Sequence, residues 1–235
     1  DLFVHTPEDM KVRFNIDVRT ENEAIRVNTK EKTVTVRSGT RGIYEESYDY
    51  LVLSPGARAY RPDIPGIDSD RVLTLKNIPD ADAIKSLTDE KGMKSAVIIG
   101  GGFIGIETAE NLVKRGVAVS VTELFPHILS QFDEDIAVLL ERELVRNGVN
   151  LFLNTSVTAI EEKEEKLEIV LSTGEKISAD FVISAAGVVP DTDFLRDSGI
   201  ELGPKGHIIV NDRMQTNVEN VYAVWDAVEV TDYIN

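Results

Sequence analysis

The sequence contains no cysteine, and this absence is the first constraint on its chemistry. Without a thiol, these 235 residues cannot form a disulfide, use a thiolate nucleophile or bind a metal through sulfur. Histidine is also scarce, since His5, His127 and His207 stand far apart and lack the spacing of a metal site. No run approaches the roughly 18 apolar residues that a membrane-spanning helix needs. We therefore expect no metal site and no membrane partner.

Positively charged residues are also few relative to acidic ones. Lys and Arg number 25 against 41 Asp and Glu, which leaves a formal net charge of −16. A chain this acidic repels the phosphates of nucleic acid, so we expect no nucleic-acid partner. A small dinucleotide is not excluded, because its phosphates need only a few local backbone donors. The 42% apolar and 28% charged residues are ordinary for a globular protein, and the length suits two modest domains.

The strongest signal lies in the stretch 96–123. It opens with the apolar run 96–99, which is typical of a buried parallel strand and ends abruptly in glycines. Gly100, Gly102 and Gly105 have the spacing GxGxxG. The first glycine permits a tight turn, the second lets a pyrophosphate approach the backbone, and the third lets the following helix pack on the strand. The N-terminus of that helix would bind the anion.

A second strand and an acidic residue complete this pattern. Val117, Val119 and Val121 predict the strand, and Glu123 stands at its end, eighteen positions after Gly105. A carboxylate there can accept both hydroxyls of an adenosine ribose and would repel a 2′-phosphate, so the pattern favours NAD(H) over NADP(H). The alternative is a glycine-rich turn in an α/β core that binds nothing, which leaves Glu123 without a role.

The remaining patterns predict that this nucleotide-binding unit is inserted between two flanking segments. We expect an α/β fold with a Rossmann-like domain, in which a parallel sheet with helices is joined by an antiparallel meander. The expected helices cover about 5–14, 78–90, 134–147 and 192–198, and the expected strands cover 15–19, 23–28, 32–37, 44–53, 72–73, 96–99, 117–121, 149–153, the meander 156–179, 180–186, 207–210 and 221–224.

Four segments together resemble the flavin-dependent pyridine nucleotide–disulfide oxidoreductases, over nearly the whole chain. They are SPGA at 54–57, GGGFIGIETAE at 100–110, SAAGVVPDT at 184–192 and MQTNVENVYAVWDAVEV at 214–230. The segments HTPEDMKVRFNIDV and GFIGIE are most similar to the branch that contains NADH oxidase, NADH peroxidase and coenzyme A disulfide reductase.

This resemblance implies a flavoprotein with two dinucleotide sites, for FAD and for NAD(H). The NAD(H)-binding domain would cover 91–190. It would be inserted in a partial FAD-binding domain, whose first part covers 1–90 and whose second part covers 191–235. Gly100, Gly102 and Gly105, with Ile104 in the same turn, would form the pyrophosphate loop, and Glu123 would accept the adenosine ribose.

Four further residues match family positions near the flavin and the nicotinamide. Phe103 matches an aromatic residue that covers the flavin until NADH displaces it, and Glu107 matches an acid near the reactive edge. Gly187 matches the strand-end backbone beside the nicotinamide, and Asp226 matches the acid that binds the flavin ribitol. Residue chemistry alone leaves other roles open: an apolar core residue for Phe103, a surface acid for Glu107 and a helix cap for Asp226.

Three family features have no counterpart in this sequence. The first FAD segment and the redox-active cysteine would lie upstream of Asp1, and the dimerisation domain would lie downstream of Asn235. We therefore expect an internal fragment of an enzyme about twice as long, and we assign no catalytic residue within it. A local departure is Trp225, which stands before Asp226 where relatives have glycine. An indole there would crowd the FAD, because glycine allows close backbone approach.

The implied activity belongs to the intact protein, a cytoplasmic homodimer that acts on a small-molecule substrate. NADH would pass a hydride to FAD, and the enzyme would then reduce dioxygen, peroxide or a coenzyme A disulfide. The sequence does not choose among these acceptors. Two alternatives stay open: a bare NAD(H)-binding module without turnover, which is what we expect of the fragment by itself, and a cysteine-free flavin reductase that serves a ferredoxin or a nitrite reductase.

Overall fold

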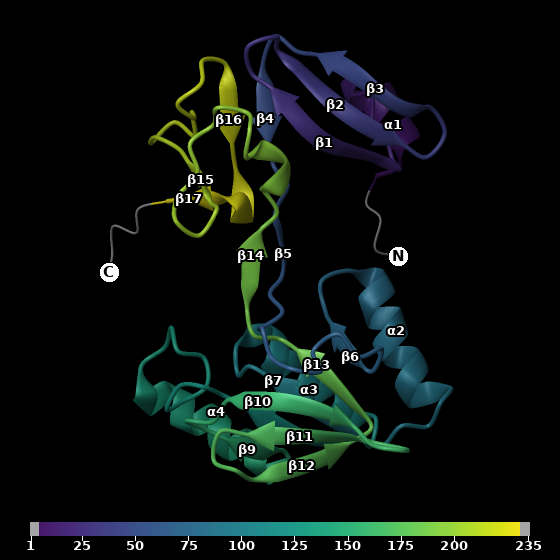
Figure 1. The fold of residues 1–235 in the computed structure, drawn as a ribbon, viewed down its shortest axis with the longest axis vertical. Coiled ribbons are helices and arrows are strands. Elements are labelled where there is room, and N and C mark those ends of the chain that lie inside the picture. Colours follow the sequence, from purple (N-terminus) through teal and green to yellow (C-terminus); the bar gives the residue numbers. More distant parts are fainter. Residues whose placement is uncertain (1–4, 231–235) are drawn as a thin grey trace. The chain divides into compact units, whose positions relative to one another are not determined.

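The computed structural model describes residues 5–230, and the chain divides into two compact units (Figure 1). The inserted unit is the continuous segment Arg58–Val189. The discontinuous unit combines the chain up to Ala57 with the chain from Pro190 onward. Each unit has a hydrophobic core of its own. Parallel strands with helices, together with antiparallel strands, confirm the predicted α/β fold class.

A five-stranded parallel sheet forms the centre of the inserted unit, with the strand order β6-β13-β7-β8-β9. The strands are short apolar runs because both faces of the sheet are covered. Val97 and Ile98, in its middle strand, are fully buried. The bounds are β6 (Val72–Thr74), β7 (Ser95–Ile99), β8 (Ala118–Thr122), β9 (Asn150–Phe152) and β13 (Phe181–Ser184).

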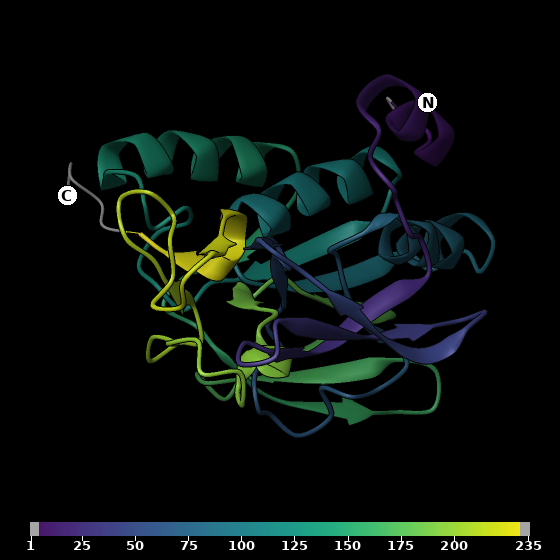
Figure 2. The same cartoon turned by 90° about the horizontal axis from the view of Figure 1, so that it is seen from above.

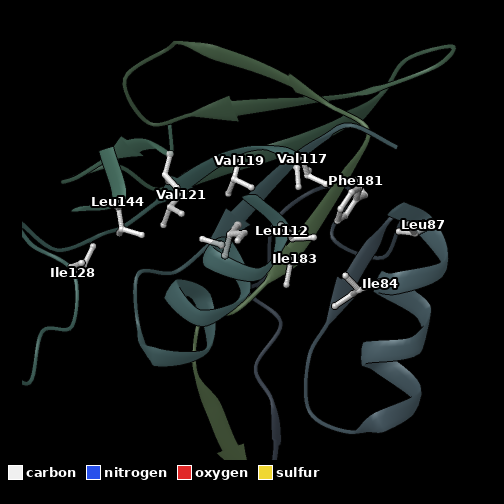
Figure 3. Packing of buried hydrophobic residues seen from close by; sticks show 14 of the residues in the cluster. Ile84, Leu87, Leu112, Val117, Val119, Val121, Ile128, Leu144, Phe181 and Ile183 are labelled. Carbon is white, nitrogen blue, oxygen red and sulfur yellow. The ribbon is translucent and has the colours of Figure 1, made fainter. Parts of the chain in front are cut away.

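Three helices cover one face of this sheet, and Figure 2 shows α3 and α4 next to each other on it. Ile98 and Ile183 point from the sheet into the same cluster as Leu112 of α3, Leu144 of α4 and Ile84 of α2. Figure 3 shows this packing from close by. The bounds are α2 (Ile78–Asp89), α3 (Phe103–Lys114) and α4 (Glu134–Arg146).

The opposite face of the sheet packs on the predicted antiparallel meander. Alternation along β7 sends Val97 and Ile99 to this side, since successive side chains of a strand point to opposite faces. There they contact a core that includes Leu167 and Ile169 of the middle meander strand. The meander strands are β10 (Val157–Glu162), β11 (Leu167–Leu171) and β12 (Lys176–Ala179), paired in that order.

Helix α4 buries less of its apolar face than its periodicity predicts. The pattern at Ile136, Leu139, Leu140, Leu144 and Val145 predicts one buried stripe, yet only Leu144 of these five is buried in the structure. The other four side chains are exposed by 40–62%. The helix packs instead through Leu144 and the small side chain of Ala137, because a small residue lets the helix lie close to the sheet.

The discontinuous unit contains an antiparallel layer, β1-β2-β3, and two short parallel pairs, β4-β16 and β15-β17. Val27, Leu53 and Ile208 belong to its core. At the boundary of the two units, β5 (Ala57–Ala59) pairs with β14 (Val188–Pro190). The remaining bounds are α1 (Pro7–Phe14), β1 (Asn22–Asn28), β2 (Thr33–Ser38), β3 (Gly42–Ser47), β4 (Leu51–Leu53), β15 (Ile208–Ile209), β16 (Val221–Ala223), β17 (Val228–Glu229) and the 3₁₀ turns η1 (Asp193–Leu195) and η2 (Trp225–Ala227).

Three local predictions in this unit are wrong. The single strand predicted over 44–53 is two strands, β3 and β4, which belong to different sheets. Residues 15–19 form no strand, because Asn15 ends α1 in the left-handed region at φ +54° and the chain then runs irregularly to β1. The helix predicted over 192–198 is only the single 3₁₀ turn η1. By contrast, the helix predicted over 5–14 is confirmed as α1, which begins after a reciprocal capping box formed by Thr6 and Asp9.

The segment 58–90, which the sequence assigns to the first FAD part, packs in the structure with the inserted unit. The reason is strand pairing: β6 pairs with β13 in parallel, from Val72↔Val182 to Thr74↔Ser184. Helix α2 then places Ile84 and Leu87 in the same core as α3. The contact boundary therefore falls after Ala57. Which cofactor each segment binds stays a prediction.

The carboxylate of Asp180 links the start of β7 to the start of β13 by hydrogen bonds. One of its carboxylate oxygens accepts hydrogen bonds from the backbone N–H of Lys94 (2.9 Å), the backbone N–H of Ser95 (2.8 Å) and the Ser95 hydroxyl (2.7 Å). Burial raises the pKa of this carboxyl, but the bonds from Ser95 and Lys94 outweigh burial and hold its pKa below the ordinary value. A depressed folded pKa means that ionised Asp180 stabilises the fold above its unfolded pKa.

We expect Asp180→Ala to lower the free energy of unfolding by about 1–3 kcal/mol at neutral pH, because two backbone donors lose their acceptor. Asp180→Asn, which keeps one carbonyl oxygen, should lose less. The difference between wild type and Asp180→Ala should shrink as the pH falls through the folded pKa, since protonation removes the same interaction. Urea denaturation at neutral and acidic pH measures both effects. A difference that stays constant with pH would contradict this account.

Candidate nucleotide-binding site

Where β7 leads into α3, two positions accept only glycine. Gly100 has φ +111°, and a Cβ there would lie 2.3 Å from the carbonyl oxygen of Ala185. A Cβ on Gly105 would lie 2.0 Å from the carbonyl oxygen of Gly100. Real Cβ atoms essentially never approach so closely. These two glycines therefore let α3 and the end of β13 close tightly on β7.

Gly102 differs from these two glycines because nothing crowds it. It is the N-cap of α3 at φ −77°, and a Cβ there would meet no atom within 4 Å. No side chain caps the helix at this end. The first N–H groups of a helix lack partners within the helix, and the helix dipole makes this end positive. Open space beside Gly102 thus faces donors suited to a phosphate.

Glu123 lies at the end of β8, the strand beside β7, and only 8% of it is exposed. Its Oε2 accepts a hydrogen bond from the N–H of Gly101 at 2.5 Å, and its Oε1 accepts one from the N–H of Phe125 at 2.9 Å. Each carboxylate oxygen can accept a second bond. The carboxylate is therefore fixed in orientation beside the glycine turn and keeps acceptor capacity for a ligand hydroxyl.

The loop after β8, which holds Pro126, packs against the glycine turn, a contact that the sequence patterns do not predict. The N–H of Leu129 bonds to the carbonyl of Gly101 at 2.9 Å, and a Cβ on Gly101 would touch the Ile128 side chain at 2.9 Å. Ile128 is fully buried, and its N–H donates to Glu141 of α4 at 3.2 Å. The available signal was the apolar pair Ile128-Leu129 within a loop, which indicates packing.

The structure places the predicted binding residues in two groups. Eight of them lie in the inserted unit, and Asp226 lies in the discontinuous unit. Phe103 is 52% exposed, so it is not the apolar core residue that was the alternative to its role near the flavin. Ile104 is 38% exposed. Glu107 is exposed on α3, and Gly187 has φ +112° with open space around it. Their roles toward a cofactor stay predictions.

Trp225 adopts a conformation that glycine prefers. Its φ is +68°, in the left-handed region, and the side chain is 77% exposed. Asp226 follows it in η2 and is also exposed. The backbone at 225 thus has the geometry that the family's glycine would suit, and the indole points into solvent. Whether the indole crowds a flavin stays a prediction.

This chain belongs to the pyridine nucleotide-disulphide oxidoreductase family, which its residues 5–234 match. It is 39% identical over its whole length to an NADH oxidase of Methanocaldococcus jannaschii, of which it covers 52%. It is 33% identical over 98% of its length to a coenzyme A disulfide reductase of Staphylococcus haemolyticus, of which it covers 51%. The chain thus spans about half the length of these curated relatives.

Solved structures show the same fold. Reduced Bacillus anthracis CoADR-RHD superposes with a TM-score of 0.93 at 39% identity, over 99% of this chain and 42% of that one. The water-forming NADH oxidase of Lactobacillus brevis, bound to NADH, gives a TM-score of 0.88 at 30% identity, over 97% of this chain and 50% of that one.

Two other kinds of feature are absent from residues 5–230. No group of three or more His, Asp or Glu side chains in this range is arranged to hold a metal ion. No helix in the same range is long and apolar enough to cross a membrane.

We expect Gly105→Ala and Gly102→Ala to separate folding from binding. Gly105→Ala forces a Cβ against backbone and should lower the free energy of unfolding by about 2–3 kcal/mol. Gly102→Ala, at an N-cap with room for a methyl group, should cost less than about 1 kcal/mol but weaken NADH binding roughly tenfold by filling the space for phosphate. Urea denaturation and calorimetric titration measure the two. Equal losses of stability in the two variants would contradict the assignment of Gly105 to helix packing and Gly102 to phosphate binding.

We expect Trp225→Gly to stabilise the protein by roughly 0.5–1 kcal/mol. Glycine relieves a left-handed penalty of about 1–2 kcal/mol, and the greater freedom of the unfolded chain returns about half of that. Trp225→Ala is the matched control, because it removes the exposed indole but keeps the strained φ, and it should be nearly neutral. Urea denaturation followed by circular dichroism measures both variants. The same stabilisation in both would rule out the backbone explanation.

Proposed function

We propose that the inserted unit binds NADH, and that the chain is the nucleotide-binding portion of an NADH-dependent flavoprotein oxidoreductase. The observation that carries this proposal is the pairing of an uncapped helix N-terminus with a fixed carboxylate. Gly102 leaves room for a pyrophosphate at the start of α3. Glu123 presents oriented oxygens at the end of the neighbouring strand. Together they fit the phosphate and the ribose of one dinucleotide.

The electrostatics of Glu123 favour NADH over NADPH. The carboxylate is largely buried, so solvent screens it weakly. A 2′-phosphate next to it would bring two negative charges together. Two backbone N–H bonds hold the carboxylate in place, so it has little freedom to turn away from such a phosphate.

In the intact protein, we propose that NADH reduces FAD and that the terminal acceptor is dioxygen, peroxide or a coenzyme A disulfide. The relatives named NADH oxidase and coenzyme A disulfide reductase support this range of acceptors. The nicotinamide supplies the hydride, and the protein supplies orientation. In this chain, Gly102 and Glu123 would fix the nucleotide, and Gly187 and Phe103 would border its nicotinamide end.

The two alternative functions, a bare nucleotide-binding module and a cysteine-free flavin reductase, can be distinguished by their flavin content and their acceptors. The discontinuous unit would supply Asp226 toward FAD, as the second part of a flavin site. A purified chain without the visible absorbance of flavin that still binds NADH would be a nucleotide-binding module without turnover. A cysteine-free flavin reductase would carry flavin and reduce an electron-transfer protein, but not peroxide or a coenzyme A disulfide.

We expect Glu123→Ala to weaken NADH binding by roughly tenfold to a hundredfold, because hydrogen bonds to a charged group contribute about 1.5–3 kcal/mol. NADPH binding should improve relative to NADH, since the repelling charge is gone. Calorimetric titration with both nucleotides measures the two affinities.

The control is Glu164→Ala, which removes one charge from the exposed turn between β10 and β11 and should change neither affinity. The NADH:NADPH ratio separates two roles of Glu123. If the affinities for both nucleotides fall equally, Glu123 only supports the loop through Gly101 and Phe125. If NADH binding is unchanged, the site assignment is wrong.

A further inference from the structure

A dinucleotide at Gly102 has a defined direction on this sheet. Strand β7 lies between β8 and β13, and Glu123 follows β8 while Gly187 follows β13 by three residues. With the adenosine ribose at Glu123, the other nucleoside must extend toward the end of β13. Phe103, the first residue of α3, directly follows Gly102 and borders this path. The position of its ring therefore decides whether the path is open.

The ring of Phe103 is held by one aromatic neighbour. It is 52% exposed and meets the ring of Phe132 edge to face, with the ring centroids 5.9 Å apart and the planes at 79°. Such pairs contribute beyond their buried area because the positive edge of one ring meets the negative face of the other. Losing this contact would leave an exposed ring with other staggered side-chain conformations to occupy.

Phe132 is itself anchored to the backbone of the site. Its N–H donates to the carbonyl of Leu129 at 2.8 Å, and the N–H of Leu129 donates to the carbonyl of Gly101 at 2.9 Å. Ile128, in the same turn, is fully buried. The backbone of Phe132 is thus tied to the glycine turn, which places its ring, 40% exposed, where it can act as a stop for the ring of Phe103.

This contact places the ring of Phe103 against the connection between β8 and α4. Phe132 lies in the connection between β8 and α4, on the Glu123 side of β7. A Cβ placed on Gly187 would meet no atom of the Phe103 ring within 4 Å, and a Cβ placed on Gly102 would meet none outside its chain neighbours Gly101 and Phe103. With its ring against Phe132, Phe103 therefore leaves the Gly187 end of the path free.

We propose that Phe132 is a positioning residue, which holds the ring of Phe103 in the open position so that the nicotinamide nucleoside can lie between Gly102 and Gly187. The inference rests on the proposed binding of NADH. Without Phe132, the Phe103 ring also occupies positions that block the path. Only part of the protein is then competent to bind, and the apparent affinity falls by that fraction.

The test compares NADH with ADP-ribose, which has the same adenosine and pyrophosphate but no nicotinamide. Calorimetric titrations use the full chain as wild type, Phe132→Ala and Phe132→Tyr. Phe132→Ala should weaken NADH binding roughly twofold to tenfold, the range that one aromatic pair supports. It should leave ADP-ribose binding unchanged. Phe132→Tyr keeps the ring and should bind both ligands like wild type.

A double-mutant cycle assigns the effect to the ring pair. In the Phe103→Ala background, adding Phe132→Ala should not change NADH binding further, because the ring to be positioned is gone. Four results would overturn the inference: an equal loss for both ligands, which marks Phe132 as support for the loop only; no loss for either; no rescue by Phe132→Tyr; or a full loss in the Phe103→Ala background. Wild-type protein that binds neither ligand overturns the proposed function and this inference with it.

Discussion

The close approach of α3 to the turn after β7 is the constraint on which the inserted unit depends. Gly105 lies so near the Gly100 carbonyl that a methyl group would collide with it. This approach lets Leu112 of α3 pack on the sheet, and it aims the helix N-terminus at the carboxyl edge of the strands. The same turn therefore sets both the packing of α3 in the core of the unit and the direction of the α3 N-terminus.

Glu123 extends this constraint to the neighbouring strand. A buried carboxylate is costly unless its oxygens are hydrogen-bonded, and the N–H groups of Gly101 and Phe125 meet that need. Because Gly101 lies in the glycine turn and Phe125 starts the following loop, one side chain links the turn, the strand end and the loop. The loop returns to Gly101 through the N–H of Leu129. The glycine turn, the Glu123 carboxylate and the loop are thereby held as one assembly.

Strong local patterns were enough to predict much of the fold. The strand at 96–99, the glycine turn, the following helix and the meander agree with the structure, because buried strands and tight turns restrict residue type at each position. Helix α4 shows the limit of such patterns. Its apolar periodicity is real, yet packing chose Ala137 and Leu144. Periodicity indicates that a helix has an apolar face, but it cannot say how much of that face the neighbouring elements cover.

The sequence by itself determined the residue types of the candidate site, which are glycines at the GxGxxG spacing and an acid after the second strand. It also determined the family, through motifs spread along the chain. Only the tertiary structure decided how these groups meet. Segment 58–90 joined the inserted unit through the β6–β13 pairing, which depends on residues more than a hundred positions apart. The contact of Phe132 with Phe103 likewise comes from the path of the loop. Spacing encodes local backbone geometry, whereas contacts between distant segments depend on how whole elements pack.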